Sequence, residues 1–114
     1  MKIYGIKNCT SVKRALSFFD SRKIAYDFID LKLTNPLRSD LERWLKSHPI
    51  DRLFNAKSST YRSLNLKELS LDDEGKIEWI LKEPRLLKRP VIECKDGTIL
   101  VGFDIKNYEK IFND

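Results

Sequence analysis

The sequence predicts an α/β protein in which two halves of the chain build one mixed sheet, with a helical insertion between the halves. Near its start the chain alternates strand-like and helix-like patterns, its middle is mostly helix-like, and a hairpin signal precedes a last short helix. The chain has 114 residues, of which 41% are hydrophobic and 34% charged. We therefore expect a single domain over 1–114 with the insertion at about 35–83.

The first half reads as a strand, a helix and a second strand. Lys2–Ile6 alternates apolar and polar residues, and a helix is predicted from Thr10 to about Arg22. Its apolar face is formed, at helical spacing, by Val12, Ala15, Leu16 and Phe19. Ile24–Leu31 alternates again, and a return to the sheet after a helix predicts a parallel βαβ unit.

The insertion begins with Asn35 as a predicted N-cap and Pro36 in the first helical position, and this helix ends at His48–Pro49. Its predicted buried stripe contains Leu37, Leu41, Trp44 and Leu45. Residues 50–69 are mixed, with one short helix possible around Thr60–Leu64.

A further helix is predicted to start at Ser70 and to end before Pro84. Asp72, Asp73 and Glu74 supply the acidic residues that a helix N-terminus favours. The side chains expected to point inward are Ile77, Ile80 and Leu81.

The second half contains two apolar strands around Asp96–Gly97, a strong hairpin signal, followed by a helix over Ile105–Phe112. A βαβ half followed by a ββα half is the order of a thioredoxin-like, or glutaredoxin-like, mixed sheet.

Cys9 lies at the predicted junction of the first strand and the first helix. Unpaired N–H groups and the positive end of the helix dipole favour a thiolate there. The polar and basic neighbours expected to stabilise this thiolate, or a bound substrate, are Lys7, Asn8, Thr10, Ser11 and Lys13. The alternative is that Cys9 is a small buried hydrophobe, and its polar neighbours argue against that alternative.

The cysteine count limits the redox chemistry that is available. Val12 stands three residues after Cys9, where many redox proteins carry a second cysteine, so regeneration needs an external thiol. Cys94 is expected to be structural, because a strand separates it from Pro90 by about 13 Å. With one histidine and two distant cysteines, no metal site and no bound cofactor are expected.

The net charge of +5 is spread over the chain without a basic cluster, so we expect no direct nucleic-acid binding. Apolar runs are too short to span a membrane and no signal-peptide pattern follows Met1. We therefore expect a cytoplasmic monomer with no membrane contact.

Four segments resemble the arsenate-reductase-like family, and within it the YffB branch rather than the Spx branch. They are GIKNCTSVKRAL at 5–16, LFNAKSSTYRSLNL at 53–66, LLKRPVI at 86–92 and ILVGFD at 99–104. The resemblance implies that Cys9 is a nucleophile and that Arg89 precedes a cis proline, Pro90, and binds an anion. Without the resemblance, this Arg-Pro pair could simply open a strand.

The resemblance also has departures. The arsenate reductases carry arginines at the positions of Asn55 and Gly102, so two of three oxyanion-binding arginines are missing here. Lys57 is expected to substitute in part, although a lysine on a loop can also be merely solvated.

We expect a thiol oxidoreductase that uses Cys9 with glutathione as co-substrate, and glutaredoxin as a possible protein partner. The first alternative is an Spx-type regulator that binds the C-terminal domain of the RNA polymerase α subunit. Val12 removes the cysteine switch of that branch, while an acidic partner could dock on Arg38, Arg43, Arg52 and Arg62, which otherwise are solvated. Arsenate reduction is the third candidate.

Overall fold

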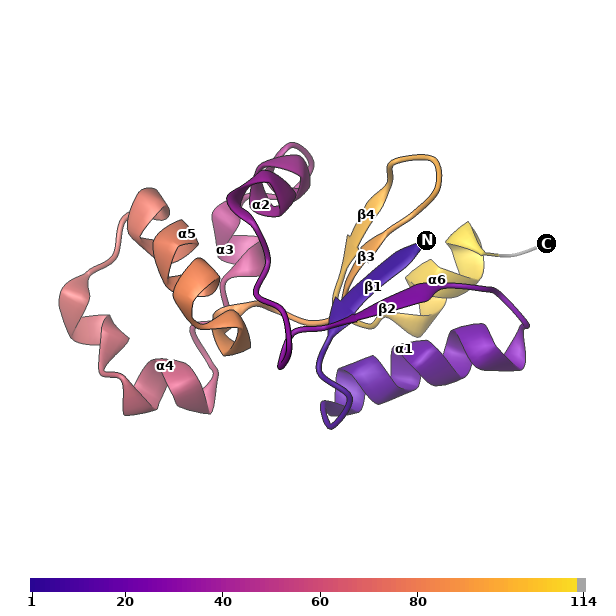
Figure 1. Ribbon diagram of the computed structural model, residues 1–114, viewed down its shortest axis with the longest axis horizontal. Helices are drawn as coiled ribbons and strands as arrows, with labels where there is room; N and C mark the ends of the chain where they lie inside the picture. The colour runs from indigo at the N-terminus through magenta and orange to yellow at the C-terminus, as the bar shows by residue number, and fades with distance from the viewer. Residues whose placement is uncertain (113–114) are drawn as a thin grey trace. The chain divides into compact units, whose positions relative to one another are not determined.

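The computed structural model describes residues 1–112, and its chain forms two units (Figure 1). Unit 1 comprises residues 1–29 together with the chain from residue 89 onward, and unit 2 comprises residues 30–88. The predicted insertion at about 35–83 lies inside unit 2. Whether the whole chain behaves as one domain stays a prediction.

Unit 1 contains a mixed four-stranded sheet, as predicted. Its strands are β1 (Lys2–Gly5), β2 (Asp27–Asp30), β3 (Val91–Glu93) and β4 (Ile99–Val101), arranged in the order β2-β1-β3-β4. β1 and β2 run in the same direction (Figure 1), whereas β3 is antiparallel to β1 and to β4. The hairpin between β3 and β4 turns at Gly97, whose φ of 93° lies in the region that favours glycine.

The second strand is shorter than predicted because the end of the preceding helix occupies its first residues. Helix α1 (Thr10–Ser21) is followed by Lys23 with a φ of 55°. The Ile24 N–H donates to the Phe19 carbonyl at 3.0 Å, which closes the helix end. Strand pairing therefore starts only at Asp27, whose N–H donates to the Met1 carbonyl at 2.9 Å.

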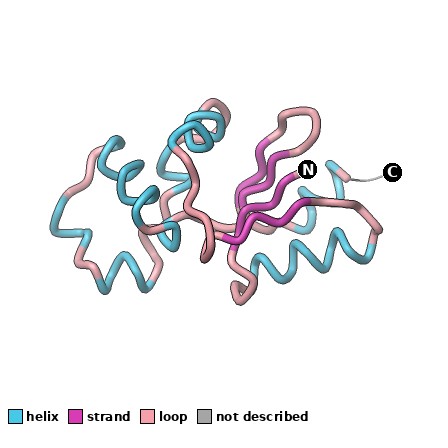
Figure 2. The backbone as a smooth tube through the Cα atoms, viewed as in Figure 1, coloured by secondary structure: helices cyan, strands magenta, loops and turns pink. Residues whose placement is uncertain are grey.

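Helix α1 and helix α6 (Ile105–Ile111) cover one face of this sheet (Figures 1 and 2). The strand side chains on that face lie in register across three strands, as Ile3, Ile92 and Leu100. The helices add Ala15, Phe18, Phe19 and Tyr108 to the same buried cluster. Burial of this apolar surface is the main stabilisation of unit 1.

Gly5 at the end of β1 allows α1 to approach the sheet closely. A Cβ atom at Gly5 would lie 2.8 Å from Cγ2 of Val12, which is fully buried. That distance is a clash, so a larger residue at position 5 would push the start of α1 away from the sheet. Gly5 thereby fixes where the first turn of α1, with Cys9 before it, lies on the strand.

Unit 2 is built from short helices (Figure 2). They are α2 (Arg38–Leu45), α3 (Ile50–Leu53), α4 (Ser59–Ser63) and α5 (Asp73–Lys82), with 3₁₀ turns at Leu66–Leu69 and Pro84–Leu86. The side chains fully buried in this unit include Leu41, Trp44, Leu53, Leu66, Ile80, Leu86 and Leu87. Helix α4 confirms the short helix predicted within the mixed stretch.

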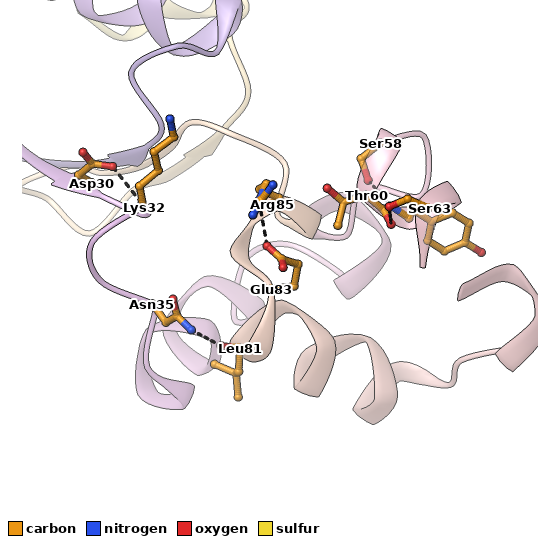
Figure 3. Close-up of polar contacts among 10 residues, drawn as sticks. Asp30, Lys32, Asn35, Ser58, Thr60, Ser63, Leu81, Glu83 and Arg85 are labelled. Atoms are coloured by element: carbon orange, nitrogen blue, oxygen red, sulfur yellow. Dashed lines mark hydrogen bonds and ion pairs between the residues drawn. The ribbon is translucent and has the colours of Figure 1, made fainter. Parts of the chain in front are cut away.

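The predicted start of α2 is wrong. Asn35 does not cap the helix, because its side-chain amide donates to the Leu81 carbonyl at 2.9 Å (Figure 3). The helix begins after Leu37, whose N–H donates to the Asp40 carboxylate at 2.8 Å, and Pro36 precedes it. The predicted buried stripe loses Leu37, which is 66% exposed, and Leu45 is half-buried, while Leu41 and Trp44 are buried as expected.

The predicted start of α5 is also wrong by two residues. Asp72, not Ser70, is the N-cap, and its carboxylate accepts the Gly75 N–H at 2.7 Å. Ser70 has a φ of 47° and closes the preceding 3₁₀ turn. Of the predicted inward side chains only Ile80 is fully buried, and Ile77 and Leu81 are half-buried.

Candidate active site

Cys9 occupies the N-cap position of α1, directly after the turn that follows β1. Its backbone is extended, with φ −85° and ψ 130°. The Cys9 N–H donates to the Ile6 carbonyl at 3.0 Å, and the Cys9 carbonyl accepts the Lys13 N–H at 2.9 Å as the first bond of the helix. The half-buried thiol is therefore attached to a rigid backbone beside the free N–H groups of the first helical turn.

The first turn of α1 is free of acidic residues, so no carboxylate there opposes a negative charge on the thiol. Thr10 and Lys13 are exposed and Ser11 is half-buried. These three residues belong to the same turn as the free N–H groups, which is the arrangement that stabilises an anion at a helix start.

Lys7 and Asn8 precede the thiol in the exposed turn after β1. The Lys7 ammonium lies 5.7 Å from the centroid of the Phe28 ring, so it contacts that ring on β2. In residues 1–112 the Cys9 sulfur accepts no capping hydrogen bond from the N–H groups of α1. The roles expected for Lys7, Asn8, Thr10, Ser11 and Lys13 therefore stay predictions.

The Arg89–Pro90 peptide bond is cis, as the resemblance implied. Pro90 is buried just before β3, and its carbonyl accepts the Gly102 N–H at 2.8 Å. Gly102 in turn accepts a hydrogen bond from the Tyr108 hydroxyl at 2.7 Å. Two hydrogen bonds thus connect the Arg89–Pro90 segment to the end of β4 and to α6.

Arg89 carries unsatisfied donors. Within the described part of the chain, its Nε and Nη1 atoms are buried without a hydrogen-bond partner, although the residue as a whole is half-buried. A guanidinium has five N–H donors in a fixed fork and no acceptor, so it favours a carboxylate or an oxyanion. Arg89 is accordingly the strongest candidate of unit 1 for an anion-binding side chain.

Gly102 is one of the two positions at which the resemblance implied an arginine that this chain lacks. Its φ of 81° lies in the left-handed region, in which any larger side chain is strained. At Gly102, just after β4, the backbone conformation itself therefore favours glycine over arginine.

Asn55 is the other position at which the resemblance implied an arginine, and it stabilises the loop of unit 2 that follows α3. Its side-chain oxygen accepts the Lys57 N–H at 3.1 Å, and its carbonyl accepts the Ser58 hydroxyl at 2.9 Å. Lys57 itself is exposed and lines a cleft of unit 2 together with Lys76 and Lys88. The structure thus brings Lys57 beside two lysines that sequence reasoning missed, and no local pattern connects these three positions.

Cys94 is free and half-buried like Cys9, but it lies just after β3 and not at a helix start. It packs against the core cluster of unit 1. Burial, and secondarily the charge of Asp96, raises the pKa of Cys94. A thiol of this kind is a poor nucleophile at neutral pH, which agrees with the structural role expected for it.

The described residues contain neither a metal-binding cluster nor a membrane-spanning helix. Among residues 1–112, no group of three or more histidine, cysteine and acidic side chains is arranged to hold a metal ion. In the same part of the chain, no helix is both long enough and apolar enough to cross a membrane.

The strand order, the helix that covers it and the cis proline define a thioredoxin-like fold with a helical insertion. The chain belongs to the ArsC family, whose family model matches residues 4–111.

Individual relatives agree with this membership over nearly the whole chain. A solved structure of a YffB protein superposes with a TM-score of 0.85 at 35% sequence identity, covering 96% of both chains. An uncharacterized protein of Haemophilus influenzae is 33% identical over 111 residues, again 96% of each chain. An arsenate reductase of Neisseria meningitidis is 26% identical over 114 residues, 97% of each chain.

Proposed function

We propose that this protein is a thiol-dependent oxidoreductase that uses Cys9 as its only nucleophile and glutathione as its reductant. The observation that carries the proposal is the position of Cys9, at the N-cap of α1 in a chain of the ArsC family. A helix start favours negative charge, and negative charge is what the attacking sulfur carries in thiol–disulfide exchange.

The proposed reaction has two exchange steps. In the first, the Cys9 thiolate attacks the glutathione sulfur of a mixed disulfide, so the substrate leaves as a thiol and Cys9 becomes glutathionylated. In the second, a glutathione thiolate attacks that glutathione sulfur, which releases glutathione disulfide and regenerates the Cys9 thiolate. The substrate gains two electrons, and two glutathione units are joined by the disulfide that forms.

Arg89 is proposed to bind a carboxylate of glutathione. Within residues 1–112, its Nε and Nη1 atoms are buried without a hydrogen-bond partner, and charge-assisted hydrogen bonds to a carboxylate contribute about 1.5–3 kcal/mol each.

The proposal is tested by the site of glutathionylation. The chain is incubated with glutathione disulfide from pH about 5 to about 9, and the modified peptide is identified by mass spectrometry. We expect glutathione on Cys9 near neutral pH and none on Cys94, whose raised pKa keeps it protonated. Modification confined to Cys94, or an unmodified chain that captures the RNA polymerase α subunit, would contradict the proposal and favour a regulatory role.

Replacing Arg89 by glutamine is expected to raise the KM for glutathione about tenfold or more, with a smaller change in kcat, because a charge-assisted contact to bound glutathione is lost. Arg89→Lys should recover part of the affinity, since it keeps the charge but not the fork. Arg85→Gln is the matched control, because Arg85 is exposed and its Nε lies 3.1 Å from the Glu83 carboxylate (Figure 3). Equal KM values for Arg89→Gln and Arg85→Gln would rule out the proposed contact.

A further inference from the structure

Unit 2 contains a cleft of about 750 Å³ that none of the thiol chemistry explains. Three lysines from separate parts of the unit line it: Lys57 in the loop after α3, Lys76 on α5, and Lys88 after the last 3₁₀ turn. The volume lies in the range of small-molecule sites, about 300–1,000 Å³. All residues of this cleft belong to unit 2, so its geometry is independent of unit 1.

The lysines are arranged around Asp51, the second residue of α3. The Lys76 ammonium lies 2.6 Å from an Asp51 carboxylate oxygen, and the Lys88 ammonium donates to the Asp51 carbonyl at 3.3 Å. The hydrogen bond with Asp51 raises the pKa of Lys76, so this lysine is charged at neutral pH. Three ammonium groups and one carboxylate leave an excess of two positive charges along the cleft.

The cleft also has an apolar wall. Phe54 and Tyr61 meet edge to face, with ring centroids 5.7 Å apart and an interplanar angle of 82°. Phe54 is almost fully buried, and the Lys76 ammonium lies 6.0 Å from its ring centroid. The half-buried Tyr61 therefore supplies the accessible part of the wall, and Phe54 supports it. A ligand for this cleft would place an apolar, flat group on the wall and its charge toward the lysines.

The choice of lysine indicates the kind of anion. Among the described residues, no arginine lines this cleft, so it lacks the planar fork that binds a carboxylate with two parallel hydrogen bonds. Lysine binds phosphate as a point charge, and a phosphate monoester carries about −1.5 to −2 charges near pH 7. That charge matches the excess of two positive charges.

We propose that this cleft binds a small organic phosphate monoester whose phosphate is held by Lys57, Lys76 and Lys88 and whose apolar part packs on Tyr61, which Phe54 supports from behind. The site goes beyond the proposed thiol function, because it needs neither Cys9 nor a disulfide. Asp51 sets the positions of two of the lysines and at the same time weakens the attraction for the anion.

The proposal is tested by calorimetric titration of the full chain with phenyl phosphate, with inorganic phosphate and with phenol as probes. Phenyl phosphate is expected to bind more tightly than inorganic phosphate, and phenol should not bind. Lys76→Gln and Lys88→Gln should each weaken phenyl phosphate binding about fivefold, as expected for a partly exposed charge pair. Lys82→Gln is the matched control, because Lys82 lies on α5 outside the cleft and should leave the affinity unchanged.

A variant that is expected to bind more tightly distinguishes a loss of lysine contacts from poor folding. Asp51→Asn removes the one carboxylate that lines the described cleft, and it should tighten phenyl phosphate binding about threefold or more. A partly unfolded chain cannot show such a gain. Cys9→Ser should bind phenyl phosphate like the wild type, so the cleft can succeed or fail independently of the thiol reaction.

Three results would overturn the proposal. One is the absence of any phenyl phosphate binding at millimolar concentration. Another is equal weakening by Lys82→Gln and Lys76→Gln, which would indicate a general charge effect. The third is inorganic phosphate binding as tightly as phenyl phosphate, which would show that the apolar wall has no part in recognition.

Discussion

Replacing Cys9 by serine is expected to abolish glutathione-dependent disulfide reduction, with a loss of about a thousandfold or more. The serine hydroxyl is not ionised near neutral pH, and an oxygen cannot form the mixed disulfide on which both exchange steps depend. The rate is measured with hydroxyethyl disulfide and glutathione, with glutathione reductase and NADPH recording the glutathione disulfide that forms.

The matched control for this variant is Cys94→Ser, which should keep the wild-type rate. Cys94 is half-buried and its raised pKa leaves it as a neutral thiol at neutral pH. Both variants keep one cysteine, so the pair separates the position of the thiol from its mere presence. A Cys9→Ser variant with wild-type turnover would remove the basis of the proposed reaction.

Replacing Tyr108 by alanine is expected to lower the free energy of unfolding by about 3–5 kcal/mol, as for other large buried aromatic side chains. Tyr108 is only 1% exposed and stacks on Phe19 at 5.6 Å between ring centroids. Edge-to-face contacts with Phe18 and Phe103, at 5.3 and 5.0 Å, complete the cluster between α1 and α6. Urea denaturation followed by circular dichroism measures the loss.

Tyr108→Phe separates the ring from its hydroxyl. We expect a loss of about 1 kcal/mol, because the Gly102 carbonyl loses the hydrogen bond that Tyr108 donates at 2.7 Å. Tyr26→Phe is the control, since the Tyr26 hydroxyl bonds the Asp20 carboxylate at an exposed position and its removal should cost less. An equal decrease in the free energy of unfolding for the two variants would show that the hydrogen bond from Tyr108 to Gly102 stabilises the fold no more than an exposed one.

The same hydroxyl predicts a dependence on pH. Burial raises the pKa of Tyr108 above its ordinary value of 10.0, so the folded state holds this proton more tightly than the unfolded chain. The stability that comes from the neutral hydroxyl is therefore complete below pH 10.0 and is lost as the pH rises toward the folded pKa. Tyr108→Phe should lack this component of the alkaline loss.

Local sequence patterns predicted the secondary structure correctly where a few neighbouring residues determine the backbone conformation. The spacing of Val12, Ala15, Leu16 and Phe19 predicted α1, and Cys9 lies at its N-cap as expected. Leu16 is half-buried, and the other three are fully buried. The pair Asp96–Gly97 predicted the hairpin, because Gly97 adopts the positive φ that the turn needs. The segments around Cys9 and Pro90 likewise carried the resemblance to the ArsC family, which the family model confirms.

Predictions based on a single residue failed where a distant segment competed for that residue. Asn35 has the chemistry of an N-cap, yet its amide bonds the Leu81 carbonyl, which is 46 positions away. Ser70 could cap a helix, but it ends the preceding 3₁₀ turn with a positive φ. Asp72 is therefore the N-cap of α5. A local pattern cannot anticipate such bonds, because the competing partner appears only after the helices have packed.

The sequence by itself determined the order of the four strands and of α1, α2, α4, α5 and α6, the position of the Cys9 thiol at a helix start, and the family, but it missed α3. Only the tertiary structure decided which side chains share a site. The burial of the Nε and Nη1 atoms of Arg89 and the grouping of Lys57, Lys76 and Lys88 around Asp51 exist only in the folded chain. The physical reason is that periodicity and capping act over one or two turns, whereas burial and charge grouping depend on residues that packing brings together.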